Sequence, residues 1–227
     1  MGHAREAMVR LLGLAGSARN DPEIFAGLVH ACRYCGLLEA SEAAHREARR
    51  LDPHIWTSVV YTWWARGEME RLVAETADAG DFQLRVMALE ALGRRDEALR
   101  SLKAIPTTTL TPVFAAMRAG LIALFEGAPG AIDAFASMVA THSDPEAFFM
   151  YAVVQAHFGE GERALAGLTN AVDGGFSVPQ ALREHPWLST LRTQPGFAGL
   201  VDKAEERRRQ ALAAFRDAGG EALLGAL

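Results

Sequence analysis

The stretch PEIFAGLVHACRYCGLLEASEAAHREARRLDP, residues 22–53, decides the fold of this chain. Apolar residues recur every three or four positions on each side of Gly36, which is the spacing of two short amphipathic helices. Gly36 suits a tight turn between them because glycine adopts positive φ without steric cost. The stretch therefore predicts a helix hairpin.

The same pattern recurs along the chain around further turn glycines. The series is Gly36, Gly67, Gly93, Gly127 and Gly159, with separations of 31, 26, 34 and 32 residues. Strand signals are nearly absent, and Thr107–Thr109 between two prolines reads as a loop. We therefore expect a series of similar helix hairpins.

The surroundings of these glycines are also similar. An aromatic residue is expected to open the first helix of the hairpin and to pack against its neighbours, as in Phe25, Trp56, Phe82 and Phe148. Five residues after the glycine, a small or modest side chain lets the second helix approach the first, as in Ser41, Leu72, Ala98 and Ala164. Aspartate followed by proline predicts helix starts at Asp21-Pro22, Asp52-Pro53 and Asp144-Pro145.

These positions resemble the signature of the tetratricopeptide repeat (TPR) family. The matching residues are Phe25, Leu28, Gly36, Ser41, Ala48 and Pro53; then Trp56, Val59, Val60, Trp63, Gly67 and Ala79; then Phe82, Gly93, Ala98 and Leu102; and last Phe148, Ala152, Gly159, Ala164, Leu168 and Ala171. The fourth unit, with Gly120, Ala131 and Phe135, fits only after a one-residue shift. The resemblance implies an all-α, right-handed superhelical solenoid of about five TPR-like hairpins with a C-terminal helical cap.

We expect three regions. Residues 1–20 read as the second helix of a truncated hairpin with an uncovered apolar face, residues 21–173 as the repeat array, and residues 174–227 as a capping segment. The half-hairpin leads us to expect a piece of a longer protein with Met1-Gly2-His3 added ahead of it. The last region, around Trp187 and Phe197, resembles the C-terminal TPR region of bacterial signalling proteins, where the repeats follow a kinase, nucleotide cyclase or DNA-binding domain.

Composition excludes several classes of protein. The net charge is −5, from 28 acidic and 23 basic residues, and this balance gives no support to nucleic-acid binding, which normally requires a basic face. No apolar run approaches the ~20 residues of a membrane span. Two cysteines do not form a disulfide framework, so we expect a reducing, cytoplasmic location.

No pattern predicts catalysis, a metal or a cofactor. Cys32 and Cys35 lie near His30 and His45, but a zinc site needs a second ligand pair, so buried thiols are the better interpretation. Gly159-Glu160-Gly161 imitates a dinucleotide-binding loop, yet it follows a helix and carries acidic residues, which favours a hairpin turn.

The remaining candidate site is the concave face formed by the first helices. Helical spacing places there His30, Arg33, Tyr34, Thr57, Tyr61, Trp64, Gln83, Met87, Glu90, Met117, Leu121, Phe149 and His157. Tyrosine and tryptophan are enriched at binding hot spots, although Tyr61 and Trp64 can equally pack against a neighbouring unit.

The expected function is therefore non-catalytic binding of a protein or peptide segment, from a partner or from an upstream domain of the same polypeptide. Two alternatives stay open. One is a structural array that homodimerises through its N-terminal end, and the other is a small-molecule sensor that uses the concave surface.

Overall fold

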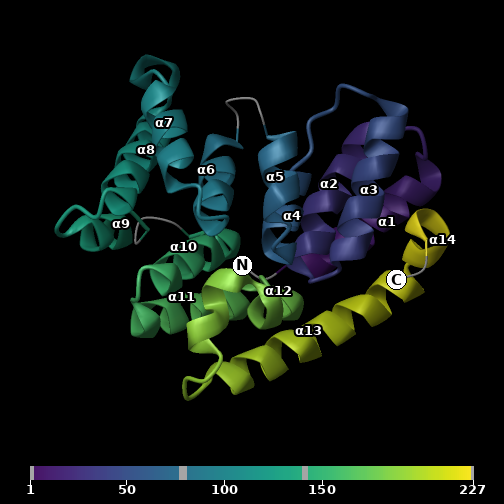
Figure 1. Ribbon diagram of the computed structural model, residues 1–227. Helices are drawn as coiled ribbons and strands as arrows, with labels where there is room; N and C mark the ends of the chain where they lie inside the picture. Colours follow the sequence, from purple (N-terminus) through teal and green to yellow (C-terminus); the bar gives the residue numbers. More distant parts are fainter. Residues whose placement is uncertain (1–2, 77–80, 140–142, 226–227) are drawn as a thin grey trace.

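The computed structural model describes residues 3–76, 81–139 and 143–225, and the regular elements in these ranges are all helical (Figure 1). The all-α prediction is confirmed. Helix α1 (Ala4–Ser17) comes first, and the helices that follow pack in neighbouring pairs. The pairs are α2 (Pro22–Tyr34) with α3 (Leu38–Leu51), α4 (Val59–Arg66) with α5 (Met69–Glu75), α6 (Phe82–Ala91) with α7 (Arg95–Ala104), α8 (Pro112–Phe125) with α9 (Ala131–Val139), and α10 (Pro145–His157) with α11 (Gly161–Gly174).

Every one of these pairs is joined at a glycine in the left-handed conformation. The φ angles are 71° at Gly36, 74° at Gly67, 73° at Gly93, 68° at Gly127 and 88° at Gly159. In each turn the residue after the glycine donates its amide to the carbonyl five residues earlier, as Leu37 does to Cys32 at 2.9 Å. This hydrogen bond satisfies a carbonyl group at the end of the first helix, so the same type of glycine turn connects the two helices of each hairpin.

The positions five residues after the glycines pack as predicted. Their side chains are fully buried: Ser41, Leu72, Ala98 and Ala164. The Ser41 hydroxyl donates to the Val29 carbonyl at 2.7 Å, which links the two helices of the first pair directly. Phe25 and Phe82 are buried and Phe148 is half-buried, so these three aromatic positions also pack between helices.

Two of the three predicted aspartate caps are confirmed. The Asp21 carboxylate accepts the amide of Glu23 at 3.0 Å, and the Asp144 carboxylate accepts the amide of Glu146 at 2.9 Å. Each therefore satisfies one of the free amides at a helix start, with proline at the following position.

The prediction for Asp52-Pro53 and Trp56 is wrong. Asp52 ends α3, and its carboxylate accepts the amide of His54 at 2.8 Å within a turn. Helix α4 begins only at Val59, so Trp56 lies ahead of it and is 69% exposed. The Thr57 hydroxyl bonds to His45 Nδ1 at 2.7 Å, which fixes the stretch before the helix against α3.

The C-terminal segment covers both ends of the set of pairs. It comprises α12 (Pro179–Glu184), the 3₁₀ helix η3 (Pro186–Leu191), α13 (Phe197–Asp217) and α14 (Gly220–Leu224). η3 packs on α10 and α11, and its Trp187 and Leu188 are buried, as expected of a cap. α13 then runs back along the molecule to α1, and α14 contacts α1 and α3 (Figure 1).

Helix α1 is consequently not the uncovered half-hairpin that the sequence predicts. Its apolar residues Met8, Leu12 and Ala15 are buried, and α2, α13 and α14 all contact the helix. The observation that favoured dimerisation through this end is therefore absent from the structure.

The 3₁₀ turn η2 (Thr107–Thr109) lies where a loop is predicted between α7 and α8. The described residues do not include Met1 and Gly2, nor Ala79, which the sequence assigns to the second unit. Within those residues, none of the helices combines the length and apolar character that crossing a membrane requires.

Candidate functional site

The predicted groove residues lie on, or just before, the first helices α2, α4, α6, α8 and α10. Contacts join several of them across these helices. The Arg33 guanidinium lies 5.4 Å from the Tyr61 ring centroid, and the Tyr61 hydroxyl accepts a hydrogen bond from Gln83 Nε2 at 3.1 Å. The predicted groove residues form a surface with two parts. The first, around Arg33, Trp64 and Glu90, is covered by other segments of the chain, and we call it the covered part. The second is a cleft that is only partly closed.

Arg33 forms the centre of the covered part. Its Nε and Nη2 donate to the two carboxylate oxygens of Glu146 at 2.6 and 2.9 Å, and its Nη1 donates to the carbonyl and hydroxyl oxygens of Ser58 at 2.9 and 3.0 Å. The Arg33 side chain is 1% exposed. A buried bidentate ion pair of this kind fixes geometry, because either partner alone would be an uncompensated charge. Helices α2 and α10, which begin 123 residues apart, are thereby held together.

Tyr34 and His30 lie beside this ion pair. The Tyr34 hydroxyl donates to Asp144 Oδ1 at 2.5 Å, and the Ser177 amide donates to the Tyr34 carbonyl at 2.9 Å. Burial, followed by the charge of Glu146, raises the pKa of Tyr34 well above its usual range. His30 lies at the surface with its ring 4.3 Å from the Tyr34 ring, and the partial desolvation of its imidazole, followed by the charge of Arg33, lowers its pKa. Tyr34 therefore acts as a neutral hydrogen-bond donor that joins α2 to the start of α10.

Trp64 is covered by the C-terminal segment rather than open to a partner. Its ring centroid lies 4.7 Å from that of His185 and 5.5 Å from that of Trp187, and the residue is 1% exposed. Of the two interpretations of Trp64 left open by the sequence, this conformation fits packing within the chain, to which the C-terminal cap contributes. Thr57 is also buried, whereas Tyr61 is half-buried.

Glu90 and His157 close the covered part on its other side. Glu90 Oε1 lies 3.0 Å from His157 Nε2, and Arg95 forms a bidentate pair with the same carboxylate. Burial alone would raise the pKa of Glu90, but the hydrogen bonds from Arg95 and His157 lower it to about 2. The His157 ring stacks on Trp187 with centroids 4.1 Å apart, so this group ties α6 and α10 to the cap.

The partly closed region is an apolar cleft between α6, α8, α9 and α10, which we call the methionine cleft. It is lined by Gln83, Met87, Met117, Leu121, Phe135, Met150, Tyr151 and Val154. Four of the predicted groove residues thus meet in one cleft. Phe149 is not among them, because its ring packs 5.1 Å from that of Phe176 under the C-terminal segment.

The chemistry of the titratable groups follows from packing. Cys32 and Cys35 are buried free thiols, as predicted, and burial raises the pKa of both. Burial and the charge of Arg192 lower the pKa of His185 to about 3, so its imidazole is neutral. In the described ranges, no cluster of three or more histidine, cysteine or acidic residues is suited to a metal ion.

Sequence reasoning missed the groups that cover the inner surface. Glu146 reads as an ordinary acidic residue in a first helical turn, and Asp144 as an N-cap, which it also is. Neither role indicates a partner on α2. The sequence predicts that Trp187 belongs to a terminal cap, but it carries no signal that the cap reaches Trp64.

Comparisons with protein-family models, with curated proteins and with solved structures found no match to this chain.

Proposed function

We propose that this chain is a non-catalytic protein-interaction module of TPR-like repeats, in which the methionine cleft binds an apolar helical segment. The segment belongs to a partner protein or to an upstream domain of the same polypeptide. The identical glycine turns of the pairs support a repeat array, right-handed as in the family that the sequence resembles. The second helices of the pairs then form its outer surface.

One observation carries the proposal: an apolar stripe on α8 runs from solvent into the cleft. Val113, Met117 and Leu121 recur every four residues and therefore share one helix face. Val113 is 54% exposed, Met117 is half-buried and Leu121 is buried. An exposed apolar stripe that continues into an apolar cleft favours a helical guest, whose own stripe would extend the packing.

The lining of the cleft suits such a guest. Met87, Met117 and Met150 are unbranched and polarisable, so they can repack around different apolar side chains. Gln83 Oε1 has no hydrogen-bond partner among the described residues, and it can accept a donor from a guest. The Arg33–Glu146 ion pair and the contact between Glu90 and His157 hold α2, α6 and α10 in place around this region.

A displayed library of helical peptides tests the proposal on the intact chain. We expect the selected peptides to carry apolar residues at helical spacing and to bind saturably in fluorescence anisotropy. Met117→Glu should weaken their binding by at least about tenfold, because the guest would bury an unpaired carboxylate.

The matched control is Ala119→Glu, which adds the same charge on the opposite face of α8, where Ala119 is exposed. This variant should bind like the original chain. Selection of peptides whose affinity is the same for Met117→Glu and Ala119→Glu would exclude the cleft as the binding site.

A further inference from the structure

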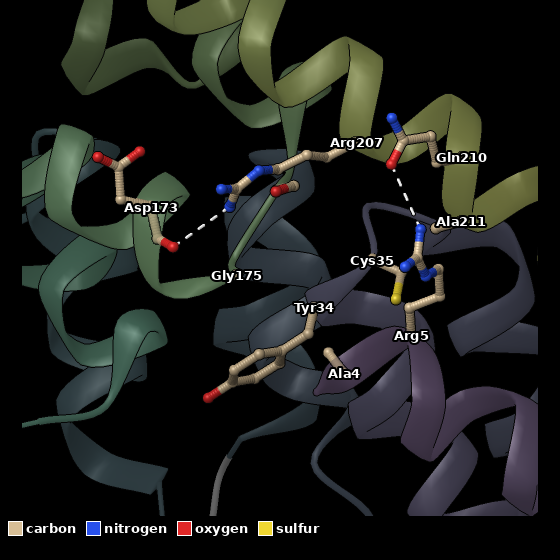
Figure 2. Close-up of a pocket in the computed structure, with 10 residues that line it drawn as sticks. Ala4, Arg5, Tyr34, Cys35, Asp173, Gly175, Arg207, Gln210 and Ala211 are labelled. Carbon is tan, nitrogen blue, oxygen red and sulfur yellow. Dashed lines mark hydrogen bonds between the residues drawn. The ribbon is translucent and has the colours of Figure 1, made fainter. Parts of the chain in front are cut away.

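A second cavity lies where the two ends of the chain meet, away from the methionine cleft. It has a volume of about 310 Å³ and lies between the start of α1, the end of α2, the end of α11 and the middle of α13. Figure 2 shows Arg207 and Arg5 entering it from α13 and α1, with Cys35 beside Arg5 and Tyr34 lower in the view. A volume of this size is at the lower limit of small-molecule sites.

Both arginines line the cavity, and their hydrogen bonds within the described residues leave several guanidinium donors unused. Arg207 donates through Nη1 to the Val172 carbonyl and, at 3.4 Å, to the Asp173 carbonyl, so its contacts with α11 are to neutral acceptors. Arg5 donates only to the amide oxygen of Gln210 at 3.3 Å, as far as the described residues go. Neither guanidinium is therefore neutralised by a carboxylate in these contacts.

The acidic residue nearest to Arg207 is otherwise engaged. The Asp173 carboxylate pairs with Lys203, and in Figure 2 it points away from the Arg207 guanidinium. On the other side, burial raises the pKa of the Cys35 thiol to about 12, and the charge of Arg5 partly opposes this rise while that of Glu6 adds to it. The positive charge of Arg5 thus acts on the cavity wall, and no thiolate forms there near neutral pH.

A buried hydroxyl supplies the second, independent observation. Ser177 lines the cavity and is 3% exposed, and its Oγ has no hydrogen-bond partner among the described residues. Burying a hydroxyl without a partner costs free energy, and such groups are rare in folded proteins. A bound acceptor would satisfy it.

The adjoining cavity, also of about 310 Å³, is mostly apolar. Ala4 and Tyr34 line both cavities, so the two are neighbours across these residues. His30, Ala7 and Pro145 contribute to the apolar one. A ligand with a charged end and a small apolar body would fit the two adjoining cavities together.

From this arrangement we propose that the cavity between α1, α2, α11 and α13 binds a small organic oxyanion. Its phosphate or carboxylate group accepts hydrogen bonds from Arg5, Arg207 and the Ser177 hydroxyl, and its apolar body lies along Tyr34. Guanidinium groups bind both kinds of oxyanion through charge-assisted hydrogen bonds. Because the ligand contacts both α1 and α13, binding stabilises the contact between the two ends of the chain.

Isothermal titration calorimetry on the full chain tests the site, with phenyl phosphate, inorganic phosphate and succinate as probes. We expect saturable one-to-one binding of at least one probe. Tighter binding of phenyl phosphate than of inorganic phosphate would assign the apolar cavity to the ligand body. Binding of succinate but of neither phosphate would identify the ligand group as a carboxylate.

Two variants make the test specific to this cavity. Arg5→Gln and Ser177→Ala should each weaken the binding by about tenfold, while Arg10→Gln, an exposed arginine on the same helix, should leave it unchanged. Ser177→Ala should melt at the same temperature as the original chain or higher, because it removes an unpartnered hydroxyl. The proposal is overturned if no probe binds saturably, or if both variants bind as tightly as the original chain.

Discussion

At the scale of single residues, Arg33 joins its own helix α2 to two segments that are distant in sequence. Its guanidinium contacts Glu146 on α10, Ser58 before α4 and the ring of Tyr61 on α4. The Ser58 carbonyl and hydroxyl, immediately before α4, both accept hydrogen bonds from this side chain, so Arg33 fixes the start of α4 against α2. Arg33, which the sequence predicts to contact a partner, thus contacts other segments of the same chain.

Replacing Arg33 by methionine should destabilise the fold by about 3–5 kcal/mol, because Glu146 would remain buried without a partner. The double variant Arg33→Met/Glu146→Leu should recover much of this loss, since an apolar pair of similar volume can replace a buried ion pair. Urea denaturation of both variants measures the effect. Equal free energies of unfolding for the single and double variants would contradict the prediction, because removing Glu146 would then relieve no unpaired buried charge.

His185 gives the fold a defined dependence on pH. The unfolded chain takes up a proton at this imidazole below about pH 6.5, whereas the folded chain, in which the pKa is about 3, does not. The unfolded state therefore binds more protons in that window, and the free energy of unfolding falls with decreasing pH by up to ~1.4 kcal/mol per unit.

In the variant His185→Asn this contribution is absent, while a side-chain acceptor remains for the Trp187 amide, which bonds to His185 Nδ1 at 3.3 Å. Denaturation at several pH values between 7 and 4 should give a shallower slope for the variant. The same slope for both proteins would contradict the burial of a neutral His185.

At the scale of helices and turns, the same glycine closure is used in different surroundings. Gly36 and Gly93 have φ angles of 71° and 73°. A Cβ added at Gly36 would lie 2.2 Å from the Ser177 carbonyl oxygen and 3.2 Å from Pro179 Cδ, whereas one at Gly93 would have no atom within 4 Å. The first turn is thus also a contact with the C-terminal segment.

The two turns should therefore respond differently to alanine. Gly93→Ala meets only the backbone cost of the left-handed conformation, about 1–2 kcal/mol. Gly36→Ala adds a clash with backbone atoms, which brings the total loss to about 2–5 kcal/mol. Thermal denaturation of the two variants compares them, and equal losses would show that the C-terminal segment does not pack on Gly36.

The sequence predicts the hairpins well because their determinants are local. Each determinant acts within one or two helices, as the turn glycines, the buried Ser41 and the Asp21 cap show. A single sequence is therefore enough to predict the hairpins. The prediction for Trp56 is wrong because its determinants are not local. Its position depends on Thr57 and Ser58, whose partners His45 and Arg33 lie in the preceding pair.

The candidate site was predictable only in part. Helical spacing places Met87, Met117 and Leu121 on a shared surface, and they meet in one cleft. The covering of Arg33 and Trp64 depends on Glu146 and Trp187, which lie more than a hundred residues further along the chain. A single sequence carries no signal that links positions so far apart.

At the scale of the whole molecule, the chain closes on itself. α2 meets α10 through Arg33 and Glu146, α4 meets α12 and η3 through Trp64, and α13 returns to α1 (Figure 1). The inner surface is thus mostly filled, and the methionine cleft is the part that we propose is left for a guest.

Small-angle X-ray scattering of the purified chain tests this closure most directly. A compact chain of 227 residues should give a radius of gyration of about 17 Å and a symmetric distribution of interatomic distances. A radius well above this value, with the long tail of an extended rod, would mean that the first and last pairs are apart in solution, and would contradict the account.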